Sequence, residues 1–174
     1  RLRDMGIEIL MPKDGAFNFA GVTTEDVVIL PAFGVTIQDF EALRQLGCVL
    51  VDTTCGSVLN VWKRVESYAR DGFTALIHGK YYHEETRATA SQVGKYPGGH
   101  YLIVRDMTEA REVCDFIEGR ASRERMHQSI PQASSPGFDP DVHLQRIGVA
   151  NQTTMLARES LAIGEEVGAA MERA

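Results

Sequence analysis

The sequence lacks long hydrophobic runs and has no excess of basic residues. No stretch approaches the roughly 18–20 consecutive apolar residues that a membrane-spanning helix needs, so we expect no membrane partner. Its 174 residues include 18 Lys and Arg against 24 Asp and Glu, a formal net charge of −6. We therefore expect no nucleic-acid partner either, and an anionic ligand would have to be held by local groups.

Cysteine is scarce, and the common glycine-rich phosphate-binding motifs are absent. The three cysteines, Cys48, Cys55 and Cys114, are an odd number, and no secretory signal is visible. An odd number of cysteines without secretory features indicates a reducing compartment such as the cytoplasm, with thiols that are free or bound to a metal. The chain contains neither a GxxxxGK[ST] loop nor a GxGxxG fingerprint.

Short apolar runs alternate with segments of helical period along most of the chain. This pattern predicts strands at 27–30, 48–51, 73–77, 101–104 and 147–150, and helices at 37–46, 58–69, 107–117 and 155–171. Strands and helices that alternate with short connections predict an α/β fold of parallel βα units, with ligand-binding loops at the carboxyl ends of the strands. Residues 120–140 break the pattern, and we expect an exposed, mobile insertion there.

Cys55 is the cysteine best placed for chemistry. It follows a predicted strand and precedes a predicted helix, where the helix dipole lowers the pKa of a thiol and favours the thiolate. A thiolate can ligate a metal or attack a substrate, while a buried, inert thiol is an equally good interpretation from position alone. For Cys48 and Cys114, on apolar faces, packing in the core is the better interpretation.

The densest polar cluster is the segment IHGKYYHEET at 77–86, which follows a predicted strand. Its His and Lys side chains can hold phosphate oxygens, and its glutamates can transfer protons. One alternative is a zinc site on His78, His83 and Glu84 or Glu85, although the spacing is not that of a helical metalloprotease motif. The other alternative is an exposed polar loop.

A second polar segment, ANQTT at 150–154, lies between the last predicted strand and the last predicted helix. Amides and hydroxyls at a helix N-terminus suit an anion or a substrate hydroxyl. They suit simple helix capping at least as well. His100 and His143 fall in predicted loops and are interpreted as surface residues.

Together these loops resemble the LytB family of 4-hydroxy-3-methylbut-2-enyl diphosphate reductases. The matching runs, in the order of the family, are ILPAFGV (29–35), VDTTCGSVLNVWKRVE (51–66), IHGKYYHEETRATASQ (77–92), VCDFI (113–117), GFDPDV (137–142) and ANQTTML (150–156). Several unrelated loops match at once, and their forms are most similar to plant and cyanobacterial members.

The resemblance implies an iron–sulfur oxidoreductase of the methylerythritol phosphate pathway of isoprenoid synthesis. Its reaction would remove the hydroxyl group of the diphosphate substrate in a two-electron reduction, giving isopentenyl and dimethylallyl diphosphates. The resemblance also implies a [4Fe–4S] cluster and an electron donor such as ferredoxin or flavodoxin. In a source with plastids, the compartment would be the plastid stroma.

The resemblance implies a role for each of five residues. Cys55 corresponds to the middle one of the three cysteines that hold the cluster, and His83 to the histidine that contacts the substrate diphosphate. Glu85 corresponds to the glutamate that delivers protons to the leaving hydroxyl. Thr153 corresponds to the threonine beside that hydroxyl, and Gln152 is its neighbour in the substrate site. These residue types suit the roles, because thiolates ligate iron–sulfur clusters and a carboxyl group can supply a proton.

Two positions depart from the family pattern. Gly56 stands where much of the family has a proline, although glycine still permits a tight turn between strand and helix. Phe33 stands where the bacterial branch has a histidine, so one diphosphate contact of that branch is missing.

The resemblance implies an internal fragment of a longer enzyme. The other two cluster cysteines of the family correspond to positions outside residues 1–174, so we expect this chain alone to hold no stable cluster. Residues 1–55 would end a first α/β domain, and residues 56–174 would form a second one, in a three-domain arrangement around a central cluster. A zinc-dependent hydrolase using His78, His83 and Glu85, and a non-catalytic α/β binding module, stay as alternatives.

Overall fold

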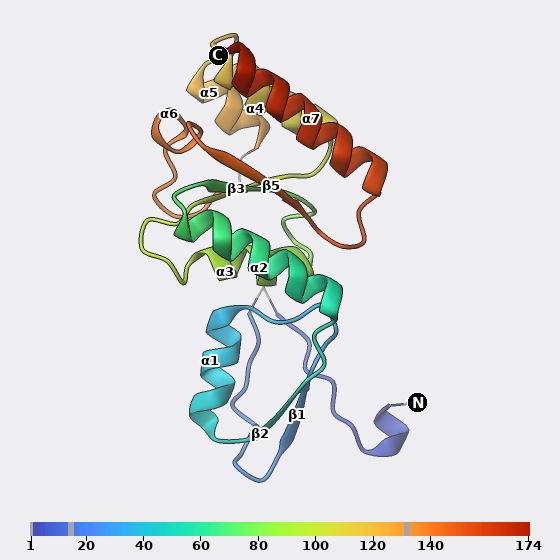
Figure 1. Ribbon diagram of the computed structural model, residues 1–174. Helices are drawn as coiled ribbons and strands as arrows, with labels where there is room; N and C mark the ends of the chain where they lie inside the picture. The colour runs from blue at the N-terminus through green and yellow to red at the C-terminus, as the bar shows by residue number, and fades with distance from the viewer. Residues whose placement is uncertain (1, 14–15, 131–132) are drawn as a thin grey trace.

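The structure is a computed structural model and describes residues 2–13, 16–130 and 133–174. Two parallel sheets form the framework (Figure 1). In the first, β1 (Val27–Leu30) pairs with β2 (Val49–Asp52). In the second, β3 (Thr74–His78) lies between β4 (Tyr101–Val104) and β5 (Ile147–Asn151). The predicted α/β fold of parallel βα units is confirmed.

Helices cover both faces of the three-stranded sheet. The helices of the described residues are the short 3₁₀ helix η1 (Arg3–Met5), α1 (Ile37–Leu46), α2 (Gly56–Arg70), α3 (Glu84–Val93), α4 (Met107–Ile117), α5 (Arg123–Ser129), α6 (Pro140–His143) and α7 (Ala157–Arg173). In Figure 1, α2 and α3 lie on one face of this sheet, and α4 and α7 lie on the other. No helix within the described ranges has the length and apolar character to cross a membrane.

The core is built around β3. All residues of β3 are buried, because helices pack on both faces of the sheet and β3 lies between β4 and β5. Leu76 and Ile77 are fully buried, and so are Val65 from α2 and Val113 from α4. A parallel sheet covered on both faces needs apolar side chains on both, which explains the continuous apolar runs in the sequence.

The helix boundaries follow local signals in the sequence. Thr36 caps α1 by accepting the backbone N–H of Asp39 at 3.2 Å, and Asp106 caps α4 by accepting that of Glu109 at 3.1 Å. Gly47 ends α1 with φ of 74°, a left-handed conformation that glycine adopts without a steric penalty. These boundaries agree with the predictions.

The predicted exposed insertion at 120–140 is wrong over much of its length. Helix α5 lies within it, and its Met126 is buried together with Ile130 and Ala133. The carbonyl of Ala133 also accepts the backbone N–H of Ile103 in β4 at 2.7 Å. The four-residue spacing of Met126 and Ile130 places both on one helix face, a weak signal in an otherwise polar segment. Residues 131–132 lie outside the described residues.

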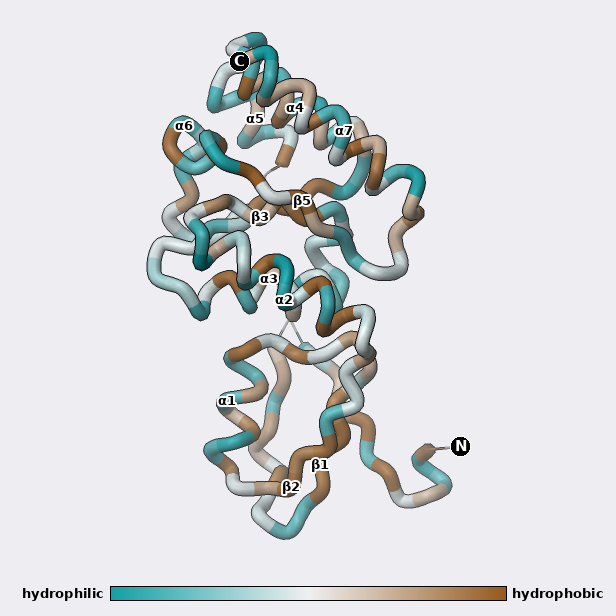
Figure 2. Tube along the Cα trace, viewed as in Figure 1, coloured by the Kyte–Doolittle hydropathy of each residue, from teal (hydrophilic) through white to brown (hydrophobic). Residues whose placement is uncertain are grey.

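The two-stranded sheet is covered on one face only. Leu30 of β1 and Leu43 of α1 are both buried. On the other face, four side chains point to solvent, and their exposed fractions are 61% for Val27, 57% for Ile29, 56% for Val49 and 42% for Val51. Figure 2 shows hydrophobic residues running along β1 and β2.

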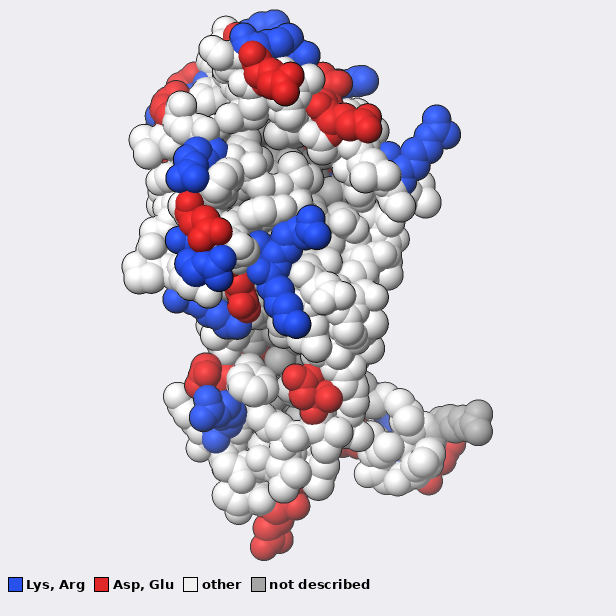
Figure 3. Space-filling view, viewed as in Figure 1, with Lys and Arg blue, Asp and Glu red and all other residues white. Residues whose placement is uncertain are grey.

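Charges of both signs are mixed over the surface. On the face shown in Figure 3, Lys and Arg side chains gather near α2, which carries the exposed Lys63 and Arg64. Other basic groups are neutralised nearby, since Lys95 pairs with Glu66 at 2.6 Å. The chain is negative overall, but its charges are distributed unevenly, and exposed basic side chains on α2 could contact an anionic ligand.

Candidate functional site

The candidate site forms where the loops after β3 and β5 meet the first turns of α2 and α3. The five residues implied by the resemblance come from three separate segments, at 55, 83–85 and 152–153. The structure joins the second and third segments by a direct hydrogen bond between Glu85 and Thr153. Cys55 is near enough for the charge of Glu85 to act on the pKa of its thiol.

Cys55 is exposed and occupies the N-cap position of α2. The backbone N–H and hydroxyl of Ser57, followed by the backbone N–H of Val58, lower the pKa of the Cys55 thiol, and burial and the charge of Glu85 oppose them more weakly. The N–H of Cys55 donates to the carbonyl of Ala32 at 2.8 Å, which fixes the residue against the loop after β1. The thiolate form needed for metal ligation is thus favoured.

The other two cysteines are less exposed than Cys55. Cys114 is buried, and burial raises the pKa of its thiol to about 11. Cys48 is half-buried, with its Sγ 3.5 Å from the carbonyl oxygen of Leu43. The predicted packing role is confirmed for Cys114, and Cys48 makes a local contact at the start of β2.

His83 caps α3 through its ring. Its Nδ1 accepts the backbone N–H of Glu85 at 3.1 Å, so in the neutral ring Nε2 carries the proton and is the available donor. The ring of Phe33 meets the imidazole edge-on, with centroids 6.1 Å apart and an interplanar angle of 69°. The phenylalanine that departs from the bacterial pattern therefore packs against this histidine.

Glu85 is a buried carboxylic acid in the first turn of α3, with 2% of its surface exposed. Its Oε1 accepts the backbone N–H of Thr153, although the two residues are 68 positions apart in the sequence. A carboxyl group in such a place is shielded from bulk water and held in one orientation. It can therefore exchange a proton with a bound molecule rather than with solvent.

Gln152 is also buried, and both its side-chain oxygen and its side-chain nitrogen form hydrogen bonds within the protein. The side-chain Oε1 accepts the backbone N–H of Lys80 at 3.1 Å and the hydroxyl of Thr86 at 3.0 Å. Its Nε2 donates to the hydroxyl of Thr154 at 2.6 Å. Gly79 makes this packing possible, because a Cβ there would lie 2.7 Å from the Thr86 hydroxyl oxygen. Lys80, Thr86 and Thr154 are partners that sequence reasoning missed.

Helix α3 was not among the predicted helices, because its segment was interpreted as a polar loop. Four of its seven buried side chains are polar, namely Glu85, Thr86, Thr89 and Gln92, and two of the other three are alanines. A helix that buries mostly polar and small side chains gives little apolar period to detect. Two glutamates in the first turn and the absence of glycine or proline before Gly94 were the available signals.

The predicted alternative of a zinc site on His78, His83 and Glu85 is not supported by the geometry. The side chain of His78 reaches Ser160 in α7 at 2.9 Å, on the face of the sheet opposite α3 (Figure 1). His83 and Glu85 belong to α3 and its cap. Among residues 2–13, 16–130 and 133–174, no group of three or more His, Cys, Asp or Glu could hold a metal ion.

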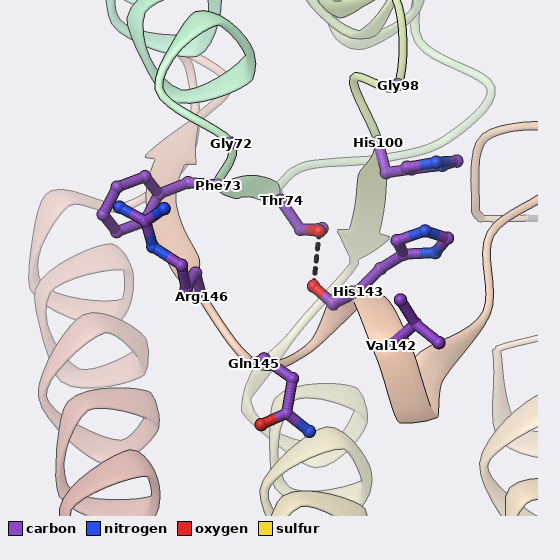
Figure 4. A pocket seen from close by; sticks show the side chains of 9 residues that line it. All are labelled: Gly72, Phe73, Thr74, Gly98, His100, Val142, His143, Gln145 and Arg146. Carbon is purple, nitrogen blue, oxygen red and sulfur yellow. Dashed lines mark hydrogen bonds between the residues drawn. The ribbon is translucent and has the colours of Figure 1, made fainter.

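His100 and His143 are not simple surface residues, and that prediction is wrong. Both are half-buried and their rings stack, with centroids 3.7 Å apart. They line a cavity of about 100 Å³ near the start of β3 and β5, at the end of the sheet away from the site loops (Figure 4). In this cavity the hydroxyl of Thr74 donates to the carbonyl of His143 at 2.5 Å.

Known proteins similar to this chain share both its sequence and its fold. A 4-hydroxy-3-methylbut-2-enyl diphosphate reductase of Synechococcus sp. (strain WH7803) is 48% identical over 172 residues, which are 99% of this chain and 41% of the relative. The chain thus spans less than half the length of the curated relatives it matches. As the loop forms predict, this relative is cyanobacterial.

Two solved structures have a similar fold. One is an (E)-4-hydroxy-3-methyl-but-2-enyl diphosphate reductase described as the terminal enzyme of the non-mevalonate pathway. It has a TM-score of 0.58 at 21% identity and covers 83% of this chain and 41% of that chain. The other is the E-1-hydroxy-2-methyl-but-2-enyl-4-diphosphate reductase from Plasmodium falciparum, with a TM-score of 0.61 at 17% identity, covering 90% of this chain and 40% of that one.

The match to a protein family extends over the whole chain. The family described as LytB protein matches residues 1–174, and the ordered loops that predict it are all within that range. The chain therefore belongs to the LytB family.

Proposed function

We propose that this chain is the part of a 4-hydroxy-3-methylbut-2-enyl diphosphate reductase that contributes one cluster ligand and the proton-donating side of the active site. The observation that supports this most directly is the buried carboxyl of Glu85, fixed by the backbone of Thr153 and within electrostatic reach of Cys55. Relatives that cover nearly all of the chain bear this enzyme name.

Cys55 fits the role of one ligand to a [4Fe–4S] cluster. The thiol is exposed, and the hydrogen bonds from the first turn of α2 that lower its pKa favour the thiolate. When bound, such a cluster would supply electrons and a Lewis-acidic iron. We propose that two further ligands come from polypeptide outside residues 1–174.

The reaction needs a proton source in a site shielded from water. Replacing the C–OH bond by C–H, with release of water, consumes two electrons and two protons. We assign proton delivery to the Glu85 carboxyl, and contact with the substrate hydroxyl to Thr153. His83 would donate Nε2–H to the diphosphate, since its Nδ1 is already bonded to the backbone of Glu85.

Gln152 would support this site by holding the loops together. The oxygen of its side-chain amide accepts hydrogen bonds from Lys80, in the loop after β3, and from Thr86 in α3, so we propose positioning as its main contribution to the substrate site.

We propose that Cys55 lies at a domain boundary, with residues 1–55 ending one α/β domain and 56–174 forming the next, in a three-domain enzyme around one cluster. The electron donor would be a ferredoxin or flavodoxin, and the compartment the cytoplasm or, in a source with plastids, the stroma.

A chimera tests the proposal. Residues 1–174 would replace the matching segment of the Synechococcus sp. (strain WH7803) reductase, and the purified protein would be assayed without oxygen for reduction of the diphosphate. We expect an active chimera in which Glu85→Gln lowers kcat at least about 100-fold while the iron content stays unchanged, because a general acid typically contributes that much. Glu84→Gln is the matched control, because Glu84 is the adjacent glutamate and pairs with Arg87 on the surface of α3.

Two outcomes would contradict the proposal. Full activity of Glu85→Gln would remove this residue from proton delivery. Full activity of Cys55→Ala with unchanged iron would favour the non-catalytic binding module, in which Cys55 is only structural. The 174-residue chain alone, reconstituted with iron and sulfide, should hold well below one cluster per chain.

A further inference from the structure

His78, the last residue of β3, is a buried histidine that the proposed chemistry does not use. It is fully buried, and its Nδ1 lies 2.9 Å from the hydroxyl oxygen of Ser160 in α7. Its Nε2 is buried without a hydrogen-bond partner among the described residues and lies 3.9 Å from Oε2 of Glu159. An unsatisfied buried nitrogen costs stability, so simple packing does not explain why a histidine is here.

The backbone of His78 is bonded to one end of the turn that carries Gln152 and Thr153. Its carbonyl accepts the N–H of Gln152 at 2.8 Å, at the point where β5 leaves the sheet. This bond fixes where the turn begins.

The side chain of His78 is bonded to the other end of the same turn. Ser160 lies in the first turns of α7, and its hydroxyl also donates to the carbonyl of Leu156, the N-cap of that helix, at 3.2 Å. The hydrogen bond between Nδ1 of His78 and the Ser160 hydroxyl forms with either group as the donor, according to the tautomer of the ring. One residue thus holds both ends of the turn at 152–156.

We propose that His78 is a positioning residue for the candidate site. By fixing the turn at 152–156 from both ends, it sets the place of the Thr153 amide and hence the orientation of the Glu85 carboxyl that this amide holds. His78 acts from the opposite face of the sheet and touches neither Glu85 nor His83. The consequence for catalysis rests on the proposed function, whereas the effect on the turn does not.

Amide hydrogen exchange in the 174-residue chain, resolved residue by residue by NMR, tests the effect on the turn. We expect Ser160→Ala and His78→Leu to lower the protection of the Thr153 amide at least about tenfold, because a local opening no longer requires breaking the side-chain bond. The amide of Leu76, at the centre of β3, should stay protected as in the wild type. His78→Asn should restore protection, because an asparagine amide can occupy the position of Nδ1 and donate to Ser160.

The outcomes separate a local effect from general destabilisation. Unchanged exchange at Thr153 in Ser160→Ala would overturn the proposal. So would equal loss of protection at Thr153 and Leu76, or failure of His78→Asn to restore it. Ser160→Ala leaves the core side chain in place, so the test does not depend on the folding of His78→Leu.

The reductase chimera connects this effect to function. There we expect Ser160→Ala to lower kcat about tenfold with KM nearly unchanged, since the proton donor is misplaced while the diphosphate contact is kept. If exchange changes as expected but the chimera is inactive even without substitution, the proposed function fails and the positioning role stands. If kcat of an active chimera is unaffected, the link from the turn to Glu85 is overturned.

Discussion

The two parallel sheets of this chain are built from similar strands but are buried very differently. The runs VVIL and VLVD in β1 and β2 are as apolar as TALIH and YLIV in β3 and β4, yet only the second sheet has helices on both faces. The apolar side chains on the open face of the first sheet stay in contact with water. The difference shows that strand composition sets which segments form a sheet, while the surrounding helices decide how much each residue contributes to stability.

The same substitution in the two sheets should have very different effects. Val104 in β4 is fully buried, whereas Val51 in β2 is 42% exposed. We expect Val104→Ala to lower the free energy of unfolding by roughly 2–3 kcal/mol, from lost burial and an unfilled cavity, and Val51→Ala by less than about 0.5 kcal/mol. Urea unfolding followed by circular dichroism measures both. Equal losses would mean that the open face of the first sheet is covered in solution.

The contact between the loop after β1 and helix α2 can be broken at one glycine. Gly34, in the loop after β1, has φ of 78°, and a Cβ there would lie 2.3 Å from Cζ2 of Trp62 in α2. We expect Gly34→Ala to destabilise the protein by about 1–3 kcal/mol, because both the backbone conformation and the ring must shift. Trp62 is the only tryptophan, so its fluorescence reports directly on this contact.

Gly21→Ala is the matched control for that substitution. A Cβ at Gly21 meets nothing within 4 Å, and Gly21 is not among the glycines with positive φ. Its unfolding midpoint should stay within error of the wild type. If the unfolding midpoint of Gly34→Ala is also unchanged, the packing of the loop after β1 against Trp62 does not contribute to stability.

Acidification from pH 7 to pH 5 should destabilise the region of the three-stranded sheet. The five histidines all lie between positions 78 and 143, and burial, followed by the nearby His143, lowers the pKa of His100. The unfolded chain then binds more protons than the folded one as pH falls below about 6.5, so stability is present at neutral pH and is lost on acidification. Because His100 is partly exposed, we expect a loss of less than about 1.4 kcal/mol between pH 7 and pH 5.

A substitution at His143, which stacks on His100, isolates the contribution of this pair to the pH dependence of stability. His143→Asn keeps an acceptor for the backbone N–H of Asp139, which Nδ1 of His143 now accepts at 2.7 Å, but it cannot become charged. Its unfolding free energy should depend less on pH than that of the wild type. An identical pH dependence would show that the stacked rings do not repel each other when protonated.

The parts of the fold that depend on local chemistry could be predicted from the sequence. Thr36 and Asp106 cap the helices they were expected to cap, and the strands lie within a residue of the apolar runs. Helix α3 could not be found in this way, because polar side chains such as Glu85 and Gln92 take the buried positions that an apolar period would reveal.

The residues of the candidate site could be predicted from the sequence, but the hydrogen bonds that join them could not. The loops identify the family, whereas the bond from Thr153 to Glu85 depends on which strands are neighbours in the sheet. In the same way, the direction of the His78 side chain depends on the pleat of β3, and the sequence alone allowed it to be grouped with His83. The stacking of His100 and His143 depends on the path of residues 133–143, and residues 133–140 of this segment fall within the predicted exposed insertion.

Cys55 is the residue through which the chain passes from one sheet to the other. Its amide is bonded to Ala32 beyond β1, and its carbonyl accepts the N–H of Leu59 at 3.0 Å in the first turn of α2. The region of the first sheet is also held to helix α3 by the bond from the Ile37 amide to the Ser91 hydroxyl at 3.1 Å and by the ring of Phe33 against His83. An atom held by the Cys55 thiol would therefore have its position set by both sheets at once.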